Sequence, residues 1–166
     1  MKKIANYFIL IISFLSLLFL TACKKVYVIS KDNASEFVDE YYEYLADNKQ
    51  GFVALDLRNL DPDYAEGHLK GFKSYQYYIA RNHLEPDTVY NERISNTFIK
   101  WMEQNYNKDL TVFLIDNDGS IVTQAAVKLK GAGYKKIYIF TSGYDNIINH
   151  LNDKIEIVTG VDDCGC

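Results

Sequence analysis

The stretch from Leu110 to Gly131, LTVFLIDNDGSIVTQAAVKLKG, decides the fold of this chain. Its first six residues, 110–115, are apolar and rich in β-formers, which predicts a buried strand. Asp-Asn-Asp-Gly at 116–119 predicts a loop. A helix that ends at Gly131 and Gly133 is predicted by an apolar stripe at helical spacing, Val122, Ala125, Ala126 and Leu129. The stretch is therefore a strand–loop–helix unit.

Strands and helices alternate over the rest of the chain. Short runs of apolar residues and β-formers predict further strands at 26–30, 52–57, 74–79, 137–140 and 155–158. Helical spacing and capping signals predict helices between Asn33 and Gly51, at 91–106 and at 144–151, with a short helical turn at 61–67 and a loop at 80–90. Because the strands are short apolar runs rather than alternating ones, we expect an α/β fold around a parallel sheet.

Composition and charge narrow the class of protein. The 166 residues are 48% hydrophobic, which allows one domain with a packed core. The net charge of -4 argues against nucleic-acid binding, which needs a clustered excess of Lys and Arg. The sequence shows no internal repeats or low-complexity tracts, so a single domain is expected.

The N-terminus has the pattern of a secretory signal. Lys2 and Lys3 precede an apolar run at 8–20, which is too short for a typical membrane span of about 20 residues. Leu20-Thr-Ala-Cys23 resembles the bacterial lipobox, which implies that Cys23 becomes the first mature residue and carries fatty-acyl chains such as palmitate. Two such chains give stable attachment, so we expect a lipoprotein on the outer face of the bacterial cell membrane. The alternative is a retained transmembrane anchor.

Removal of residues 1–22, which carry two lysines and no acid, changes the net charge from -4 to -6. We expect four parts: the signal peptide at 1–22, a lipidated N-terminus with the first strand at 23–34, the main domain at 35–158 and a Cys-containing tail at 159–166.

Two blocks of the sequence together resemble a rhodanese domain. The first comprises Leu55-Asp-Leu-Arg58 and Tyr64-Ala-Glu-Gly-His-Leu-Lys-Gly71. The second is the strand–loop–helix unit and its continuation through Gly131-Ala-Gly-Tyr134 to Ser142-Gly-Tyr144. The resemblance covers roughly residues 35–152. It implies a central parallel sheet with helices on both faces, and structural roles for Asp56, Arg58, Glu66, Gly67 and His68.

The resemblance also implies an active-site loop at a strand end, where backbone N–H groups cradle an anion and a Cys carries a persulfide. Here the loop consists of Asp116, Asn117, Asp118, Gly119, Ser120 and Ile121, without Cys, Lys or Arg. Asp116 stands at the nucleophile position, and Asp cannot form a persulfide. We therefore expect a homologue inactive in sulfur transfer that binds a protein or small-molecule ligand, with no cofactor.

Several roles are open for Asp116. Its carboxylate could accept the N–H bonds of the cradle, which would lower its pKa. It could instead form a cation site with Asp118 and Ser120, although the ligand set is poor. A solvated polar loop without function is the simplest alternative. Phosphoryl transfer through Asp116 lacks the partner groups that it would need.

The C-terminal tail contains Cys164 and Cys166. A Cys-x-Cys pair could form a strained, easily reduced disulfide, chelate a soft metal or carry sulfur, and it could also be inert. The alternative function is therefore a sulfur-handling or thiol-disulfide enzyme that uses this pair.

Overall fold

A computed structural model describes residues 27–46, 51–151 and 153–161. The helices are α2 (Ala34–Ala46), α3 (Asp87–Asn105), α4 (Ser120–Ala132) and α5 (Tyr144–Ile148), with a π-helical turn, η1 (Leu60–Tyr64). The strands are β1 (Tyr27–Lys31), β2 (Phe52–Asp56), β3 (His68–Leu69), β4 (Lys73–Ser74), β5 (Thr111–Ile115), β6 (Lys136–Phe140) and β7 (Ile157–Val158).

Five strands form a parallel sheet in the order β1-β6-β5-β2-β4. β3 and β7 form a separate antiparallel pair. All five residues of β5, at the centre of the large sheet, are buried. A strand covered on both faces is expected to be largely apolar, which explains why Thr111 is the one polar residue of β5.

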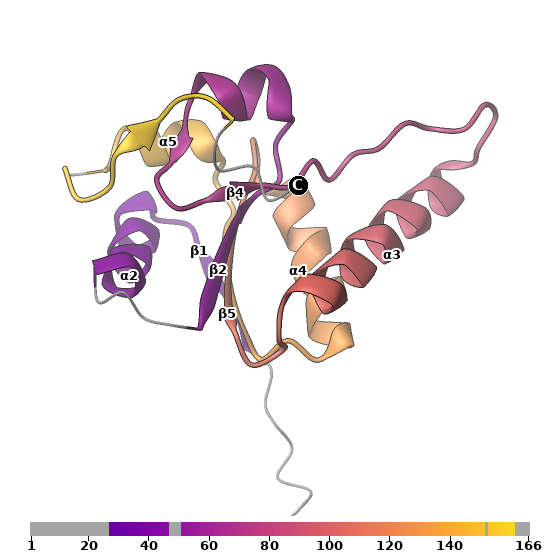
Figure 1. The fold of residues 1–166 in the computed structure, drawn as a ribbon, viewed down its shortest axis with the longest axis horizontal. Helices are drawn as coiled ribbons and strands as arrows, with labels where there is room; N and C mark the ends of the chain where they lie inside the picture. Colours follow the sequence, from indigo (N-terminus) through magenta and orange to yellow (C-terminus); the bar gives the residue numbers. More distant parts are fainter. Residues whose placement is uncertain (1–26, 47–50, 152, 162–166) are drawn as a thin grey trace, which may run out of the picture.

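Helices cover both faces of the large sheet (Figure 1), with α2 and α5 on one face and α3 and α4 on the other. The side chains of β5 alternate between the two cores. Val112 and Leu114 pack on the side of α3 and α4, whereas Phe113 and Ile115 pack on the side of α2 and α5. The predicted α/β fold with a parallel sheet between two helical layers is therefore confirmed.

Four predicted elements need correction. The strand expected at 74–79 is limited to Lys73–Ser74, because the neighbouring β2 ends at Asp56, whose carbonyl accepts the N–H of Tyr75 at 2.9 Å. The side chain of Tyr75 packs against Trp101 of α3, with ring centroids 4.5 Å apart. The expected final strand at 155–158 is reduced to β7, which lies outside the parallel sheet.

The third correction concerns α3, which begins at Asp87, within the segment 80–90 that was expected to be a loop. Pro86 stands at the N-cap, and Asp87 places a negative charge in the first turn, where the helix dipole favours it. The helix predicted at 144–151 is also shorter and ends at Ile148.

The parallel arrangement brings the carboxyl ends of β2, β5 and β6 to one edge of the sheet. Asp56 ends β2, Asp116 follows β5, and Thr141 follows β6. Ligands of open parallel α/β sheets bind outside the carboxyl ends of the strands, so we expect the functional site at this edge. Within the described residues, no helix combines the length and apolar character that a membrane crossing requires.

Candidate functional site

The loop between β5 and α4 is organised around the carboxylate of Asp116. Oδ1 accepts the N–H of Gly119 at 2.5 Å, and Oδ2 accepts the N–H groups of Ile121 at 2.7 Å and Val122 at 3.0 Å. Gly119 is the N-cap residue of α4 and has no side chain to accept these bonds. Asp116, only 1% exposed, thus satisfies donors of the first helical turn from within the loop.

The loop packs tightly against the segment that follows β6. Gly119 has a φ of +85°, and a Cβ there would lie 2.1 Å from the carbonyl oxygen of Thr141. Gly143 has a φ of +84°, and its Cβ would lie 2.1 Å from the carbonyl oxygen of Asn117. Only glycine fits at both positions, so these two residues hold the two loops against each other.

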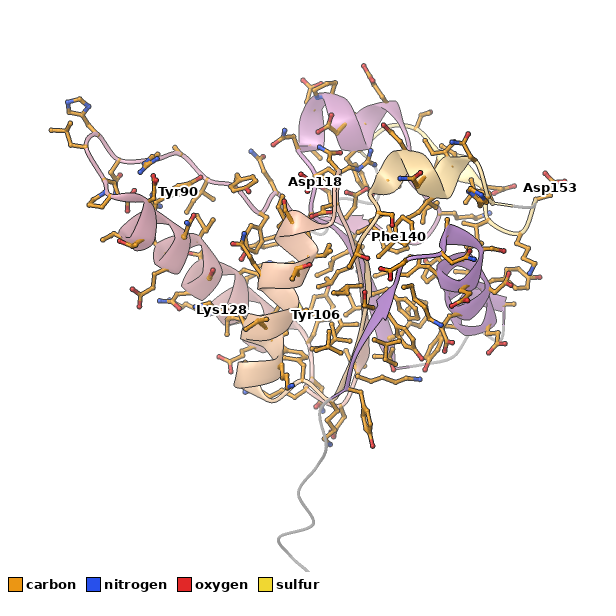
Figure 2. All side chains as sticks on the ribbon, turned by 180° about the vertical axis from the view of Figure 1, so that it is seen from behind. Tyr90, Tyr106, Asp118, Lys128, Phe140 and Asp153 are labelled. Carbon is orange, nitrogen blue, oxygen red and sulfur yellow. The ribbon has the colours of Figure 1, made fainter. Side chains whose placement is uncertain are left out.

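The outer part of the loop is solvent-exposed. Asn117, Asp118 and Ser120 are exposed, in contrast to Asp116. Asp118 Oδ1 accepts the N–H of Ser120 at 2.9 Å, and hydrogen bonds from Ser120 lower the pKa of Asp118. Figure 2 shows Asp118 at the N-terminal end of α4. The loop is therefore polar on its outside and filled by a carboxylate inside.

The pKa of Asp116 differs from the expectation. Burial raises this pKa above its ordinary value, and the N–H bonds from Val122, Gly119 and Ile121 offset the effect only in part. The Asp116 carboxylate accepts the N–H groups of the cradle, as the first hypothesis for this residue predicted. The lowered pKa that this hypothesis also predicted is wrong. The cost of removing the charge from water exceeds the gain from three backbone donors.

Asp56 and Arg58, at the end of β2, form a buried ion pair. Arg58 Nη2 lies 2.7 Å from Asp56 Oδ2 and donates a second bond of 2.7 Å to the carbonyl of Gly67. The guanidinium also lies 3.4 Å from the ring centroid of Tyr144. Burial opposes the charged form of Arg58, but the hydrogen bonds and charge of Asp56 outweigh it and raise the pKa of Arg58. This network ties β2 to the η1–β3 segment and to α5.

A pocket of about 450 Å³ lies beside this network. Its lining includes five of the residues singled out in the sequence, Arg58, Glu66, Gly67, Asn117 and Tyr144. It also includes four that sequence reasoning missed: Asp63, Asp145, Ile148 and Ile157. The missed residues come from η1, α5 and β7, and no sequence spacing indicates that these elements meet.

His68 does not line this pocket. It is buried in β3, its Nδ1 lies 3.0 Å from the carbonyl oxygen of Tyr64, and its ring stacks on that of Tyr64 with centroids 3.7 Å apart. These contacts hold the end of η1 against β3.

The three cysteines, Cys23, Cys164 and Cys166, lie outside the described residues. Between Tyr27 and Val161, in the parts that the structure describes, no group of three or more His, Cys, Asp or Glu side chains could hold a metal ion. Both oxygens of Asp116 already accept N–H bonds, which argues against the cation site considered with Asp118 and Ser120.

The geometry defines a class of protein: a parallel α/β domain in which a strand–loop–helix unit folds its backbone N–H groups around an anionic group. The model of the rhodanese-like domain family matches residues 37–150. This chain therefore belongs to the rhodanese-like domain family.

Solved structures agree with this fold. The crystal structure of the Alr3790 protein from Anabaena sp. superposes with a TM-score of 0.50 at 14% identity, covering 68% of this chain and 74% of that one. The solution structure of the rhodanese-like domain of the same protein gives a TM-score of 0.50 at 13% identity, covering 75% and 78%. No curated protein is significantly similar to this chain in sequence.

Proposed function

We propose that this chain is a lipid-anchored, extracytoplasmic rhodanese-like module that lacks sulfurtransferase activity and binds a ligand or partner. The observation that carries the proposal is the position of the Asp116 carboxylate, which accepts three N–H bonds inside the loop cradle. The family's chemistry needs a thiolate at this place to take up sulfur, and the cradle to stabilise the anionic donor.

The charge of the loop supports the same conclusion. Asp116 and Asp118 contribute two carboxylates, and the loop 116–121 contains no Lys or Arg. An anionic donor such as thiosulfate would meet like charge instead of a basic side chain. The described residues contain no cysteine that could act in its place.

The membrane anchor rests on the sequence around Cys23. Only residues 24–26 separate Cys23 from the first residue of β1, so an acylated Cys23 would hold the amino end of this strand near the membrane. The other strands of the large sheet run parallel to β1. The loop at Asp116 would therefore face away from the lipid surface.

The test of inactivity is a thiosulfate:cyanide sulfurtransferase assay on the full-length chain, purified in a neutral detergent, and on its Cys164→Ser/Cys166→Ser variant. No turnover is expected from either protein. Turnover that survives in the double variant would overturn the proposal, because it would require a route through the Asp116 loop. Turnover that is lost in the double variant would instead establish the tail as a sulfur-handling site.

The anchor is tested separately by fractionation of cells that express the Cys23→Ser variant. Release of this variant from the membrane fraction is the expected result. A variant that stays in the membrane would show that the N-terminal segment is retained as a helix.

A further inference from the structure

We propose that the pocket beside Arg58 binds an alkylammonium group, that is, an aliphatic chain that ends in a primary ammonium. This inference deepens the proposed function, on which it rests, by naming the class of ligand that the module takes. The rhodanese-like fold itself does not imply a cationic ligand.

The first reason is the charge of the pocket wall. Three acids line the pocket, Asp63, Glu66 and Asp145, and Arg58 is the only basic residue among the described residues that line it. The charge of Arg58 is already neutralised by its buried pair with Asp56. Within the part of the chain that the structure describes, no Lys, Arg or His forms an ion pair with any of the three lining acids. The pocket therefore attracts cations.

The second reason is a buried polar atom in the wall. Tyr144 is only 4% exposed, and among the described residues its hydroxyl has no hydrogen bond of normal geometry. The Arg58 guanidinium stacked on the ring interacts with it electrostatically and offsets part of the rise in the Tyr144 pKa that burial causes. The Tyr144 ring is held in place by this guanidinium. A buried hydroxyl without a hydrogen bond of normal geometry is unfavourable. A ligand N–H that reaches it gains a hydrogen bond, and little conformational entropy is lost because the Tyr144 side chain is already held in place.

The remaining lining decides what kind of cation fits. The three acids do not form a cluster that could hold a metal ion, so their charges suit separate N–H donors on an organic group. Ile148 and Ile157 add an apolar wall that can cover methylene groups. The volume of about 450 Å³ lies within the range of small-ligand sites. A lysine side chain of a partner and a free polyamine share this chemistry.

The test is isothermal titration calorimetry of the full-length chain in neutral detergent at low ionic strength, with two probes. Spermidine represents a free polyamine, and acetyl-Lys-Lys-Lys-amide represents a protein partner. The pocket variant is Asp63→Asn/Glu66→Gln/Asp145→Asn. We expect it to bind at least one probe roughly tenfold more weakly than the unchanged chain, since each lost charge pair contributes a factor of a few.

A matched control separates the pocket from general electrostatics. Glu43→Gln/Glu92→Gln/Asp153→Asn removes the same charge from exposed acids that do not line this pocket. The control should change the affinity by less than about twofold, because its carboxylates are screened from the site. Tyr144→Phe should weaken binding several-fold without lowering the unfolding midpoint, which distinguishes a ligand contact from a structural role.

The two probes distinguish the sources of the ligand. Binding of spermidine alone supports a free polyamine, and binding of the peptide alone supports a protein partner. The inference is overturned if neither probe binds, or if the pocket variant and the control lose affinity equally. Sulfurtransferase turnover of the same preparation is scored independently, so the proposed inactivity and the cationic ligand can fail separately.

Discussion

Replacing Asp116 by Ala tests whether its carboxylate holds the loop and the start of α4 together. The change removes the acceptor of three N–H groups, those of Gly119, Ile121 and Val122. A buried donor without a partner costs roughly 1–3 kcal/mol. Part of this cost is offset because Asp116 no longer has to be buried as a charge, and because water can enter from the exposed side of the loop.

We therefore expect Asp116→Ala to lower the free energy of unfolding by about 2–4 kcal/mol. For a domain of this size, such a loss corresponds to a fall of roughly 6–12 °C in Tm. The assay is urea unfolding followed by the fluorescence of Trp101, the single tryptophan, with far-ultraviolet circular dichroism as a second probe. Coincident transitions from the two probes would support a two-state description.

The matched control is Asp118→Ala, which removes an exposed carboxylate two residues further along the same loop. Asp118 accepts a backbone bond only from Ser120, so we expect a loss of about 0.5–1 kcal/mol. The reasoning is refuted if Asp116→Ala unfolds within about 0.5 kcal/mol of the unchanged chain. It is also refuted if the Asp118 variant is the less stable of the two.

Three further predictions follow from burial and backbone geometry. Because the pKa of Asp116 is raised on folding, the unchanged chain should gain stability relative to Asp116→Asn as the pH falls from neutral through that pKa. The gain should level off below the unfolded pKa of about 3.9. Urea unfolding at several pH values measures it, and a loss of stability relative to Asp116→Asn on acidification would contradict the prediction. Gly119→Ala should destabilise the domain by more than about 2 kcal/mol or prevent folding, since its Cβ would meet the backbone of Thr141. The control Gly131→Ala, at an open helical site, should stabilise the domain by about 0.5–1 kcal/mol. Thermal melts measure both variants, and equal effects would refute this account. Tyr144→Phe removes a buried hydroxyl that has no hydrogen bond of normal geometry among the described residues, so the calorimetric Tm should stay the same or rise. A clear fall would contradict this, because it would show that the contact with Arg58 is a stabilising hydrogen bond.

The central unit of the fold could be predicted from the sequence because its signals are local. The buried strand β5 is apolar apart from Thr111, since helices cover both of its faces. Gly133 ends α4 with a φ of +93°, as its place after the apolar stripe predicts. Asn33 starts α2 by accepting the N–H of Ser35 at 2.9 Å. In each case a few neighbouring residues decide the outcome.

Elements whose extent depends on distant partners were predicted less well. The strand beginning near Ser74 stops early because β2, its partner, ends at Asp56. β7 pairs with β3 rather than with the large sheet, and nothing within either short segment specifies this pairing. A strand of two residues has too little pattern for the sequence to reveal its partner.

The candidate site also combines features that depend on local sequence with features that depend on distant parts of the chain. The sequence by itself determined that the loop after β5 carries Asp116 and no cysteine or basic residue, because residue identity at a strand end is a local property. Only the tertiary structure decided that the carboxylate is buried in the cradle with a raised pKa, since this depends on how much water the packing of the neighbouring segment excludes. Likewise, only the fold brings Asp63, Glu66 and Asp145 to one pocket beside Tyr144, because charges far apart in the chain meet only when η1 and α5 converge at the edge of the sheet.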